Sequence, residues 1–366
     1  MWIDRLARWV PGGIGGACLA VFFLVLLILP HGDPPRAQTA GAAHPAMPDG
    51  RFIRIGARTF TSLKEALANA QDYDDVLIGP GSYEEAGIVK ANWVRIIGAP
   101  GVKVHGKAAR GKGAFLVQGD HTTIENIECF DVMVSDNNGV CVRLEGRNLT
   151  LRNVYFHHSQ GGLLTGRDAG TVTIENSRFE HMGRGAFFHG VYVGGGKLLI
   201  SKSSFLATRN EGHEIKSRAE TTIIEDCVIA SMDAEDSRLI DLPNGGVAVI
   251  RRSVLLEGPN SVNYDLLSFG VEGISYDRNS LELDGNIIVV DLPRRANLVT
   301  IADGLPDPVL HNNVVIGDIA FDWPGLNLFL KSREEAGLAP YPALPDLPGA
   351  PAEVEAFPSS PTGARQ

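Results

Sequence analysis

The chain of 366 residues has few positive charges and few aromatic side chains. Lys and Arg number 33 against 43 Asp and Glu, so the net charge is −10, and aromatic residues make up 7%. No stretch is basic enough to wrap nucleic acid, and we exclude nucleic acid as a partner. An acidic protein can still bind an anionic polymer through a local positive patch.

Cysteine is also scarce, with four in the chain. Cys18 lies in an N-terminal apolar run, which leaves Cys129, Cys141 and Cys227 for the folded part. An odd number is not typical of a disulfide framework, so we expect buried free thiols.

Residues 1–50 have the pattern of an export segment. Arg5 and Arg8 precede an apolar run over residues 14–29, which indicates insertion with the N-terminus inside. The run is long for a signal peptide and short for a spanning helix, and small residues at 37–43 offer a cleavage site. We expect an uncleaved anchor in the inner membrane, with cleavage as the alternative. The rest of the chain is then periplasmic or extracellular.

What the sequence has in abundance is a short repeat with glycine-containing turns. Copies recur at spacings of 23 to 27 residues, and their first large apolar residues are Ile124, Leu151, Ile174, Ile200, Ile224 and Ile250. Each copy alternates apolar and polar residues and ends in Gly, Asn or Asp. Such a period has no room for helices and predicts one coil of a parallel β-solenoid per repeat. Asn126, Asn153 and Asn176 form a column, interpreted as an inward ladder at a turn.

The repeats are preceded by a segment that predicts a helix at the open end of the solenoid. Thr61 or Ser62 can cap it, and its apolar face is formed by Leu63, Ala66, Leu67 and Ala70. The helix is followed by "IGPGSYEE" (78–85) and "VRIIGAPGVKVHG" (94–106).

This succession resembles the opening of right-handed parallel β-helix proteins of the pectate-lyase-like superfamily, and the resemblance covers about residues 52–317. It implies an all-β, single-stranded right-handed parallel β-helix over residues 51–320. Residues 321–366 are expected to hold a short capping helix, over 326–338, and a Pro-rich disordered tail.

Each coil has a second strand upstream of the motif. Taking Val142, Thr165, Val191, Ile215 and Ile240 as inward gives an outward column of Arg143, Gly166, Tyr192, Lys216 and Asp241. A second outward column, two positions earlier, holds Cys141, Leu164, Gly190, Glu214 and Leu239. His189, His213 and Arg238 stand at the strand entrance, and Arg218 and Asn244 lie just past their strands. Gly166 and Gly190 would open a groove for a ligand.

This cluster around "NEGHEIKSR" (210–218) has two interpretations, a binding or catalytic site and a solvated charged edge; we favour the site. His158 and His181 also align, and we interpret them as structural. The acidic run 233–236 lacks the alternating spacing of a Ca²⁺ loop. No residue is therefore assigned to a metal, although Ca²⁺ stays open as a cofactor.

Members of the superfamily mostly act on acidic polysaccharides, by β-elimination, C5 epimerisation or hydrolysis, so the resemblance implies a uronate-containing polymer as partner. Elimination and epimerisation both neutralise the uronate carboxylate and remove the C5 proton. "EIKS" resembles the Lys-bearing coil of chondroitinase-B-like and alginate-lyase-like enzymes, which implies Lys216 as base and Arg218 as acid or carboxylate clamp. Asp241, one coil away, favours the charged ammonium, so His213 or Tyr192 is the alternative base.

The remaining candidates, Arg143, His189, Glu214, Arg238, Asp241 and Asn244, are expected to bind substrate. Two further hypotheses stay open. Glu214 and Asp241, about 8 Å apart by strand geometry, could serve an inverting hydrolase. Alternatively, the solenoid is a membrane-anchored scaffold that binds a polysaccharide during export without cutting it.

Overall fold

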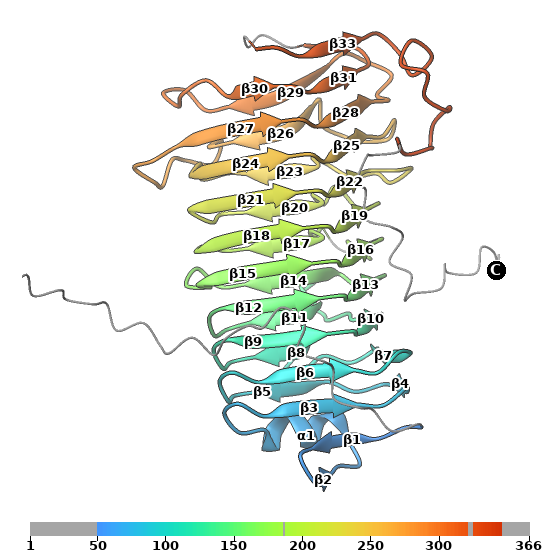
Figure 1. Cartoon of the computed structure of the whole chain (residues 1–366), viewed down its shortest axis with the longest axis vertical. Helices are drawn as coiled ribbons and strands as arrows, with labels where there is room; N and C mark the ends of the chain where they lie inside the picture. Colours follow the sequence, from blue (N-terminus) through green and yellow to red (C-terminus); the bar gives the residue numbers. More distant parts are fainter. Residues whose placement is uncertain (1–49, 186, 321–324, 346–366) are drawn as a thin grey trace, which may run out of the picture. The chain divides into compact units, whose positions relative to one another are not determined.

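The computed structural model describes residues 50–185, 187–320 and 325–345. Within them the chain winds through three sheets, and successive coils add one strand to each sheet (Figure 1). All strand pairs are parallel except those that β1 makes with β2 and β3. The prediction of an all-β parallel β-helix is confirmed.

Sheet A contains β2 (Arg58–Thr59), β1 (Ile53–Ile55), β3 (Asp75–Ile78), β6 (Arg95–Gly98), β9 (Thr122–Glu125), β12 (Leu149–Arg152), β15 (Thr171–Glu175), β18 (Lys197–Ser201), β21 (Thr221–Glu225), β24 (Val247–Arg251), β27 (Ser280–Asp284) and β30 (Val309–His311). Sheet B contains β4 (Gly81–Tyr83), β7 (Val102–His105), β10 (Glu128–Phe130), β13 (Tyr155–His157), β16 (Arg178–Glu180), β19 (Ser204–Leu206), β22 (Val228–Ala230), β25 (Val254–Glu257), β28 (Ile287–Val290), β31 (Val314–Ile316) and β33 (Leu328–Leu330). Sheet C contains β5 (Gly87–Val89), β8 (Gly113–Val117), β11 (Val140–Leu144), β14 (Gly161–Thr165), β17 (Val191–Val193), β20 (Ile215–Ser217), β23 (Ile240–Leu242), β26 (Asp265–Phe269), β29 (Ala296–Ile301) and β32 (Ile319–Ala320).

The register of sheet A confirms the repeat. Ile124 pairs with Leu151, Leu151 with Ile174, and the column continues through Ile200, Ile224 and Ile250. These side chains are buried in one core cluster that runs through the coils. Because the same apolar position recurs in each coil, stacking the strands buries a continuous core.

The inward polar ladder lies one residue later than the sequence predicted. Asn126, Asn153 and Asn176 are themselves the turn residues, with φ of 58°, 51° and 48°. They are not buried, and the amide of Asn153 donates to that of Asn126 (2.7 Å). The buried ladder is formed by Ser177, Ser203, Ser253, Asn286 and Asn313. Its side-chain oxygens accept backbone N–H groups of the preceding coil, as Ser203 Oγ does from Ser177 N (3.1 Å).

The N-terminal helix is confirmed as α1 (Leu63–Asn69), with the Ser62 hydroxyl accepting a hydrogen bond from the backbone N–H of Glu65. Its buried side chains, Leu63, Ala66 and Leu67, belong to the same core cluster as the coils. Helix α1 therefore closes the N-terminal end of this core (Figure 1).

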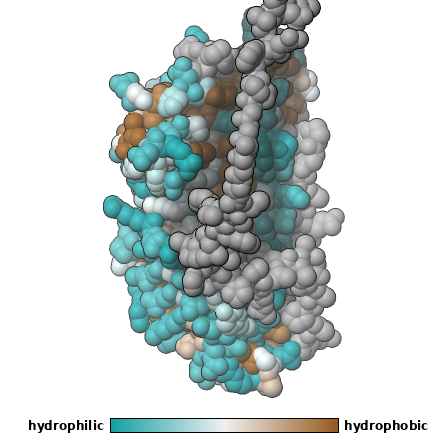
Figure 2. Space-filling model, turned by 60° about the vertical axis from the view of Figure 1, so that its left-hand side comes forward, coloured by the Kyte–Doolittle hydropathy of each residue, from teal (hydrophilic) through white to brown (hydrophobic). Residues whose placement is uncertain are grey.

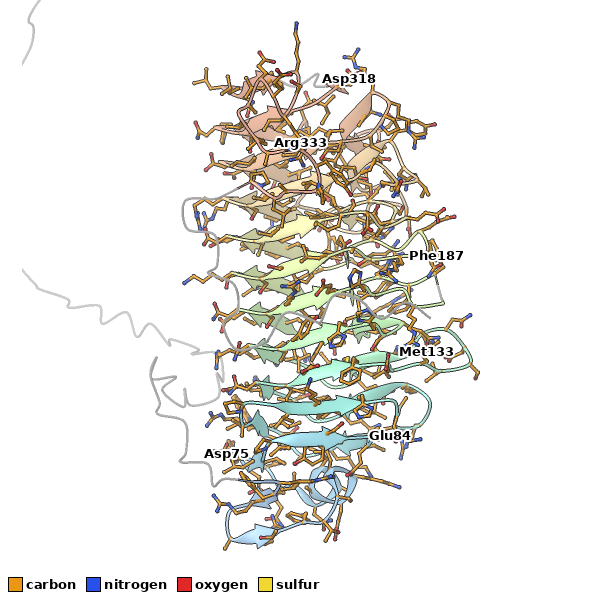
Figure 3. The ribbon with its side chains drawn as sticks, turned by 90° about the vertical axis from the view of Figure 1, so that its right-hand side faces the viewer. Asp75, Glu84, Met133, Phe187, Asp318 and Arg333 are labelled. Carbon is orange, nitrogen blue, oxygen red and sulfur yellow. A yellow bond between two sulfur atoms is a disulfide. The ribbon has the colours of Figure 1, made fainter. Side chains whose placement is uncertain are left out.

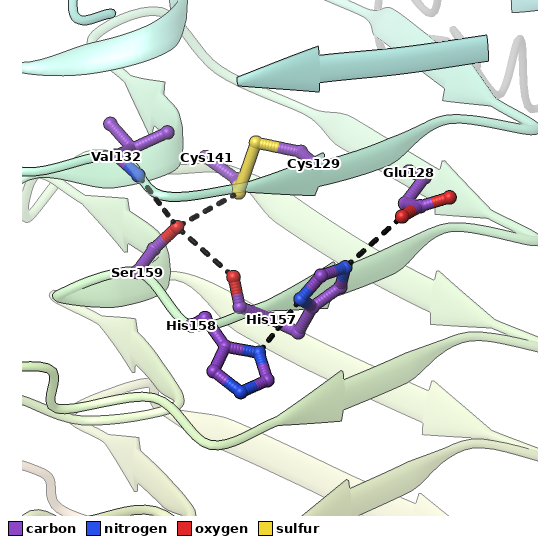
Figure 4. The surroundings of a disulfide bond; sticks show 7 residues. All are labelled: Glu128, Cys129, Val132, Cys141, His157, His158 and Ser159. Atoms are coloured by element: carbon purple, nitrogen blue, oxygen red, sulfur yellow. Dashed lines mark hydrogen bonds and ion pairs between the residues drawn. A yellow bond between two sulfur atoms is a disulfide. The ribbon is translucent and has the colours of Figure 1, made fainter. Parts of the chain in front are cut away.

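The expectation of free thiols is wrong for two of the cysteines. Cys129 in β10 and Cys141 in β11 form a disulfide across the loop that joins sheet B to sheet C (Figure 4). An odd count does not exclude one bridge, and the two residues belong to the same coil. Cys227 is free and buried, as expected.

The expected helix over residues 326–338 is also wrong. This stretch holds β33 and turns, and among residues 325–345 there is no helix. Ala336, Leu338 and Tyr341 pack on apolar side chains of the outer face of sheet B, namely Leu206, Ala230, Leu256, Val289 and Ile316. Figure 3 labels Arg333, whose guanidinium donates to both carboxylate oxygens of Asp291, each at 2.7 Å. The segment is held to the sheet by apolar contact and by this ion pair.

None of the described residues forms a helix with the length and apolar character needed to cross a bilayer. The predicted anchor at residues 14–29 and the Pro-rich tail after residue 345 lie outside the described residues. In the space-filling view most of the visible surface is hydrophilic, and apolar side chains gather in the upper coils (Figure 2).

Candidate functional site

The outward column predicted on sheet C is present over its central strands. Tyr192 pairs with Lys216, Lys216 with Asp241, and Asp241 with Ser268. One position was wrong: Thr165 pairs with Leu144, so Leu164 and not Gly166 stands next to Tyr192. A shift of two residues keeps the same side chains inward, so alternation alone cannot detect it.

Lys216 is the centre of a buried ion-pair network. Its Nζ lies 2.6 Å from Asp241 Oδ2 and 2.8 Å from Glu272 Oε1, and the side chain is 9% exposed. Asp241 also accepts hydrogen bonds from the hydroxyl of Ser268 and from Nε2 of His213, the latter at 3.3 Å. The ammonium is held between two carboxylates.

Arg218 lies at the end of β20 and joins the network to its surroundings. Its Nε donates to the Tyr192 hydroxyl (2.7 Å) and its Nη1 to Asn244 Oδ1 (2.6 Å). Its Nη2 pairs with Glu272. Lys216 and Arg218 therefore hold one carboxylate between them, each binding one of its oxygens.

Glu272 was missed by the sequence analysis. It comes from the loop 270–279 after β26, outside the repeat, and this loop lies against the preceding coil. The Glu272 N–H donates to the carbonyl of Pro243 (2.9 Å), and the Tyr276 hydroxyl donates to the carbonyl of Arg218 (2.5 Å). Its carboxylate remains half-exposed. No motif marks it, because only the folded loop brings it to Lys216.

The two histidines of the site each accept a backbone hydrogen bond at Nδ1. His213 Nδ1 accepts the backbone N–H of Arg238 (3.2 Å), and His189 Nδ1 accepts that of His213 (3.1 Å). A ring nitrogen that accepts a hydrogen bond carries no proton, so Nε2 is the nitrogen that carries the ring proton. The rings stack with centroids 4.8 Å apart.

The charges of the network agree with this assignment. Burial works to raise the pKa of Asp241, but the hydrogen bond from His213 and the charge of Lys216 outweigh it and hold the pKa well below its usual range. Burial also works to raise the pKa of Glu272, but the hydrogen bonds and charges of Lys216 and Arg218 outweigh it, and the pKa is lowered. Burial lowers the pKa of His189, and the charge of Lys216 acts in the same direction. Both carboxylates are charged and His189 is neutral.

Three predicted substrate-binding residues do not join this cluster. Glu214 is buried, and its two oxygens form hydrogen bonds with Thr208 N (2.7 Å) and Thr208 Oγ1 (2.6 Å). Arg238 is paired with Asp265 (2.6 Å). Arg143 lies in the same outward column, two strands from Tyr192, hence at about 10 Å.

The second outward column was wrong at Cys141, Glu214 and Leu239. Cys141 and Leu239 are in the core cluster, and Glu214 is 1% exposed. These residues stand at the corner where loops from sheet B enter sheet C, so their side chains face protein although strand alternation points them out. Glu214 is therefore enclosed by protein, which leaves its carboxyl without the access to substrate that an inverting hydrolase needs.

No group of three or more His, Cys, Asp or Glu side chains among the described residues is placed to hold a metal ion. A hollow of about 460 Å³ lies elsewhere, at the ends of sheet B strands, and its lining includes His158 and His181.

The chain matches the family model of the right-handed β-helix region over residues 101–289, and it belongs to this family. No curated protein matches the sequence.

Solved structures with a similar fold include an alginate lyase from Paenibacillus sp. str. FPU-7, with 17% identity, a TM-score of 0.48 and coverage of 74% of this chain and 96% of that one. ORF18 of Geobacillus virus E2 has 15% identity and a TM-score of 0.42, with coverage of 74% and 55%. Pectate lyase Pel9A has 15% identity and a TM-score of 0.41, with coverage of 73% and 71%. The chain spans about half the length of the viral protein.

Proposed function

We propose that the protein binds an acidic, uronate-containing polysaccharide across the outer face of sheet C and acts on it as a lyase or epimerase. The observation that carries this proposal is that Lys216 and Arg218 both bind the same carboxylate, each through one of its oxygens. In the structure that carboxylate belongs to Glu272, on a surface loop. A uronate carboxylate has the same shape and charge, and Arg and Lys are the side chains suited to it.

The division of roles follows from the hydrogen bonds. A base needs a free lone pair, and Lys216 is held as an ammonium by Asp241 and Glu272. His213 has its Nδ1 occupied by a backbone N–H and its Nε2 proton directed at Asp241. We therefore assign Lys216 and Arg218 to the carboxylate and Tyr192 to proton transfer.

Tyr192 suits this role because its hydroxyl oxygen accepts a hydrogen bond from the Arg218 guanidinium (2.7 Å), which holds it beside the proposed carboxylate position. In an elimination the phenolate would take the C5 proton, a C4–C5 double bond would form, and the C4–O bond would break. The resulting Tyr192 hydroxyl would return a proton to the leaving oxygen. In an epimerisation Tyr192 would keep the proton it took, and a water molecule on the opposite face would protonate C5 and leave hydroxide, which the Tyr192 proton finally neutralises.

We place the protein in the periplasm or outside the cell, held at the inner membrane by residues 14–29. The apolar run after Arg5 and Arg8 supports this, and so does the Cys129–Cys141 disulfide, because disulfides persist in oxidising compartments.

The second candidate function is a binding scaffold for polysaccharide export. It is favoured by the same closed network, since neither Lys216 nor His213 offers a free base. The hydrolase alternative has less support, because Glu214 is buried away from Asp241's face of the sheet.

The full chain, incubated with a panel of uronate polymers with and without Ca²⁺, separates these candidates. We expect the ultraviolet absorbance of unsaturated uronates to rise if it is a lyase, or the C5 hydrogen to exchange with solvent deuterium if it is an epimerase. Tyr192→Phe should abolish the reaction and keep polymer binding, whereas Lys216→Met should lose both. Lys197→Met, on exposed sheet A surface, is the matched control. Polymer retained without reaction would identify the scaffold; no retention of any uronate polymer would refute the proposal.

A further inference from the structure

A second polar hollow lies away from the Lys216 network, where sheet B strands end. Its volume is about 460 Å³, within the range of about 300–1,000 Å³ typical of small-molecule sites. Its lining consists of Phe130, Asp131, His157, His158, His181, Arg184 and Arg209. None of these residues belongs to sheet C.

The backbone explains why these side chains converge. Asp131, His158 and His181 each follow a sheet B strand and have φ of 55°, 51° and 52°. In each of these three coils the residue after the strand has a left-handed backbone conformation, which turns the chain sharply. Because it does so at the same place in each coil, the three side chains stack in one column. Arg184 lies further on in the loop that begins at His181, and Arg209 lies in the corresponding loop of the next coil, after β19.

Glu128, His157 and His158 form a chain of hydrogen bonds that ends in the hollow (Figure 4). His157 Nε2 lies 3.3 Å from Glu128 Oε1, and His157 Nδ1 lies 2.8 Å from His158 Nδ1. Burial raises the pKa of Glu128, but hydrogen bonds from His157 and Lys103 outweigh it and the net shift is downward. Glu128 is therefore a carboxylate and His157 donates to it through Nε2.

One proton lies between the two Nδ1 atoms. Burial and the neighbouring His157 lower the pKa of His158 to about 4, so this ring is neutral at neutral pH. Because Nδ1 of His158 is taken by His157, its Nε2 is the ring nitrogen left for a ligand. Within the described part of the chain, no side chain forms a hydrogen bond with this Nε2.

The positive charge of the hollow comes from its two arginines. Arg209 is oriented by His181, whose Nδ1 accepts from Arg209 Nη2 (3.1 Å) and whose Nε2 faces Glu180 (3.4 Å). Arg184 pairs with Asp131, and both side chains are partly exposed. Apart from its histidines, the lining carries two positive charges and one negative, on a protein whose net charge is −10.

We infer that this hollow is a second binding site, for a sugar acid. The guanidinium of Arg209, with that of Arg184, would take the carboxylate, and His158 Nε2 would form a hydrogen bond with a neighbouring hydroxyl. Acetate offers no such hydroxyl, and a neutral sugar offers no charge. The two requirements together select a carboxylate with an adjacent hydroxyl. The site shares no residue with the Lys216 network and does not rest on the function proposed for it.

The test uses the full chain titrated with glucuronate and, in parallel, with glucose and acetate. The ¹⁵N resonances of the histidine rings are followed by NMR, and affinity is measured by calorimetry. We expect glucuronate to shift His158 and to bind more tightly than acetate or glucose. Arg209→Gln should weaken glucuronate binding about tenfold or more. Arg167→Gln, an exposed arginine outside the hollow, should leave it unchanged.

Two results would overturn the inference. One is a wild-type protein whose His158 resonances do not respond to saturating glucuronate. The other is binding that Lys216→Met removes and Arg209→Gln leaves intact, since the only sugar-acid site would then be on sheet C. The wild-type titration decides the question even if Arg209→Gln fails to fold. If Lys216→Met loses activity on the polymer but still binds glucuronate at His158, the two sites are separate.

Discussion

Glu272 is placed where a substrate carboxylate would bind. It contacts both Lys216 and Arg218, yet it belongs to a surface loop and remains half-exposed. A ligand that uses the same two cations must displace it, and the affinity of the site is reduced by the free energy of that displacement.

Glu272→Gln should therefore bind uronate polymers more tightly, by about tenfold, because a neutral amide competes less well for the two cations. Binding of defined uronate oligosaccharides by calorimetry measures the change. Glu282→Gln is the control, since Glu282 on sheet A has the same side-chain exposure of 45%. Weaker binding by Glu272→Gln would show instead that Glu272 contacts the ligand directly.

Glu214 makes the stability of the fold depend on pH. Burial, and the nearby Asp236, raise its pKa to about 8 from an ordinary value of 4.5. Between these values the folded chain holds a proton that the unfolded chain has lost. The free energy of unfolding therefore falls as pH rises, by up to about 1.4 kcal/mol per pH unit.

Glu214→Gln should remove this loss. The amide keeps both contacts, with its oxygen accepting from Thr208 N and its nitrogen donating to Thr208 Oγ1. Urea denaturation at about pH 5 and about pH 8 measures the free energy of unfolding. The value for the variant should rise relative to that of the wild type as pH rises. Glu211→Gln, at an exposed position in the same loop, is the control, and its free energy of unfolding should change with pH as that of the wild type does. An unchanged pH slope in Glu214→Gln would mean that this carboxyl does not stay protonated.

At the scale of the coil, the Cys129–Cys141 disulfide closes the loop that carries Asp131 and begins next to Phe130. Figure 4 shows the bridge beside Ser159, whose hydroxyl accepts the Val132 N–H (3.0 Å) and donates to the His157 carbonyl (3.3 Å). Met133 and Phe187, labelled in Figure 3, are exposed on this loop and on the 183–188 loop. The bridge thus ties down the loop beside the hollow.

Replacing both cysteines by serine should cost about 3 kcal/mol of unfolding free energy, as expected for a sequence separation of 12. Denaturant unfolding with and without reductant measures this, and the variant should no longer respond to reductant. Cys227→Ser is the control. Cys227 occupies the buried ladder position where Ser203 and Ser253 precede and follow it, so serine should fit there. If reductant left the unfolding free energy of the wild type unchanged, this would argue against the disulfide.

Coils were predictable from sequence because one apolar position recurs at each turn, as Ile124 and Leu151 do. Alternation then placed Tyr192, Lys216 and Asp241 outward. It failed at β14, where a shift of two residues preserves the inward set, and at Glu214, where a corner loop covers an outward position. It also could not find Glu272, whose contact with Lys216 spans 56 residues of sequence.

At the scale of the whole described chain, the segment after β33 stabilises the C-terminal coils. It covers apolar side chains on the outer face of sheet B, Leu256 and Val289 among them. Arg333 fixes it through Asp291 and through the carbonyls of Ala339 (3.0 Å) and Ala343 (2.9 Å). Both members of the ion pair are largely buried, at 11% and 14% exposed.

Arg333→Met should release this segment, because it removes all four hydrogen bonds and leaves Asp291 without its partner. Breaking a buried ion pair costs about 3–5 kcal/mol, and we expect the loss to be local to β25, β28 and β31. Hydrogen–deuterium exchange should rise in those strands and stay unchanged in β9 and β12. Arg295→Met, which removes an exposed pair with Asp318 at 3.9 Å, should change little, by less than about 1 kcal/mol. If exchange rose equally along every coil of Arg333→Met, the segment would be part of one cooperative unit and the local account would fail.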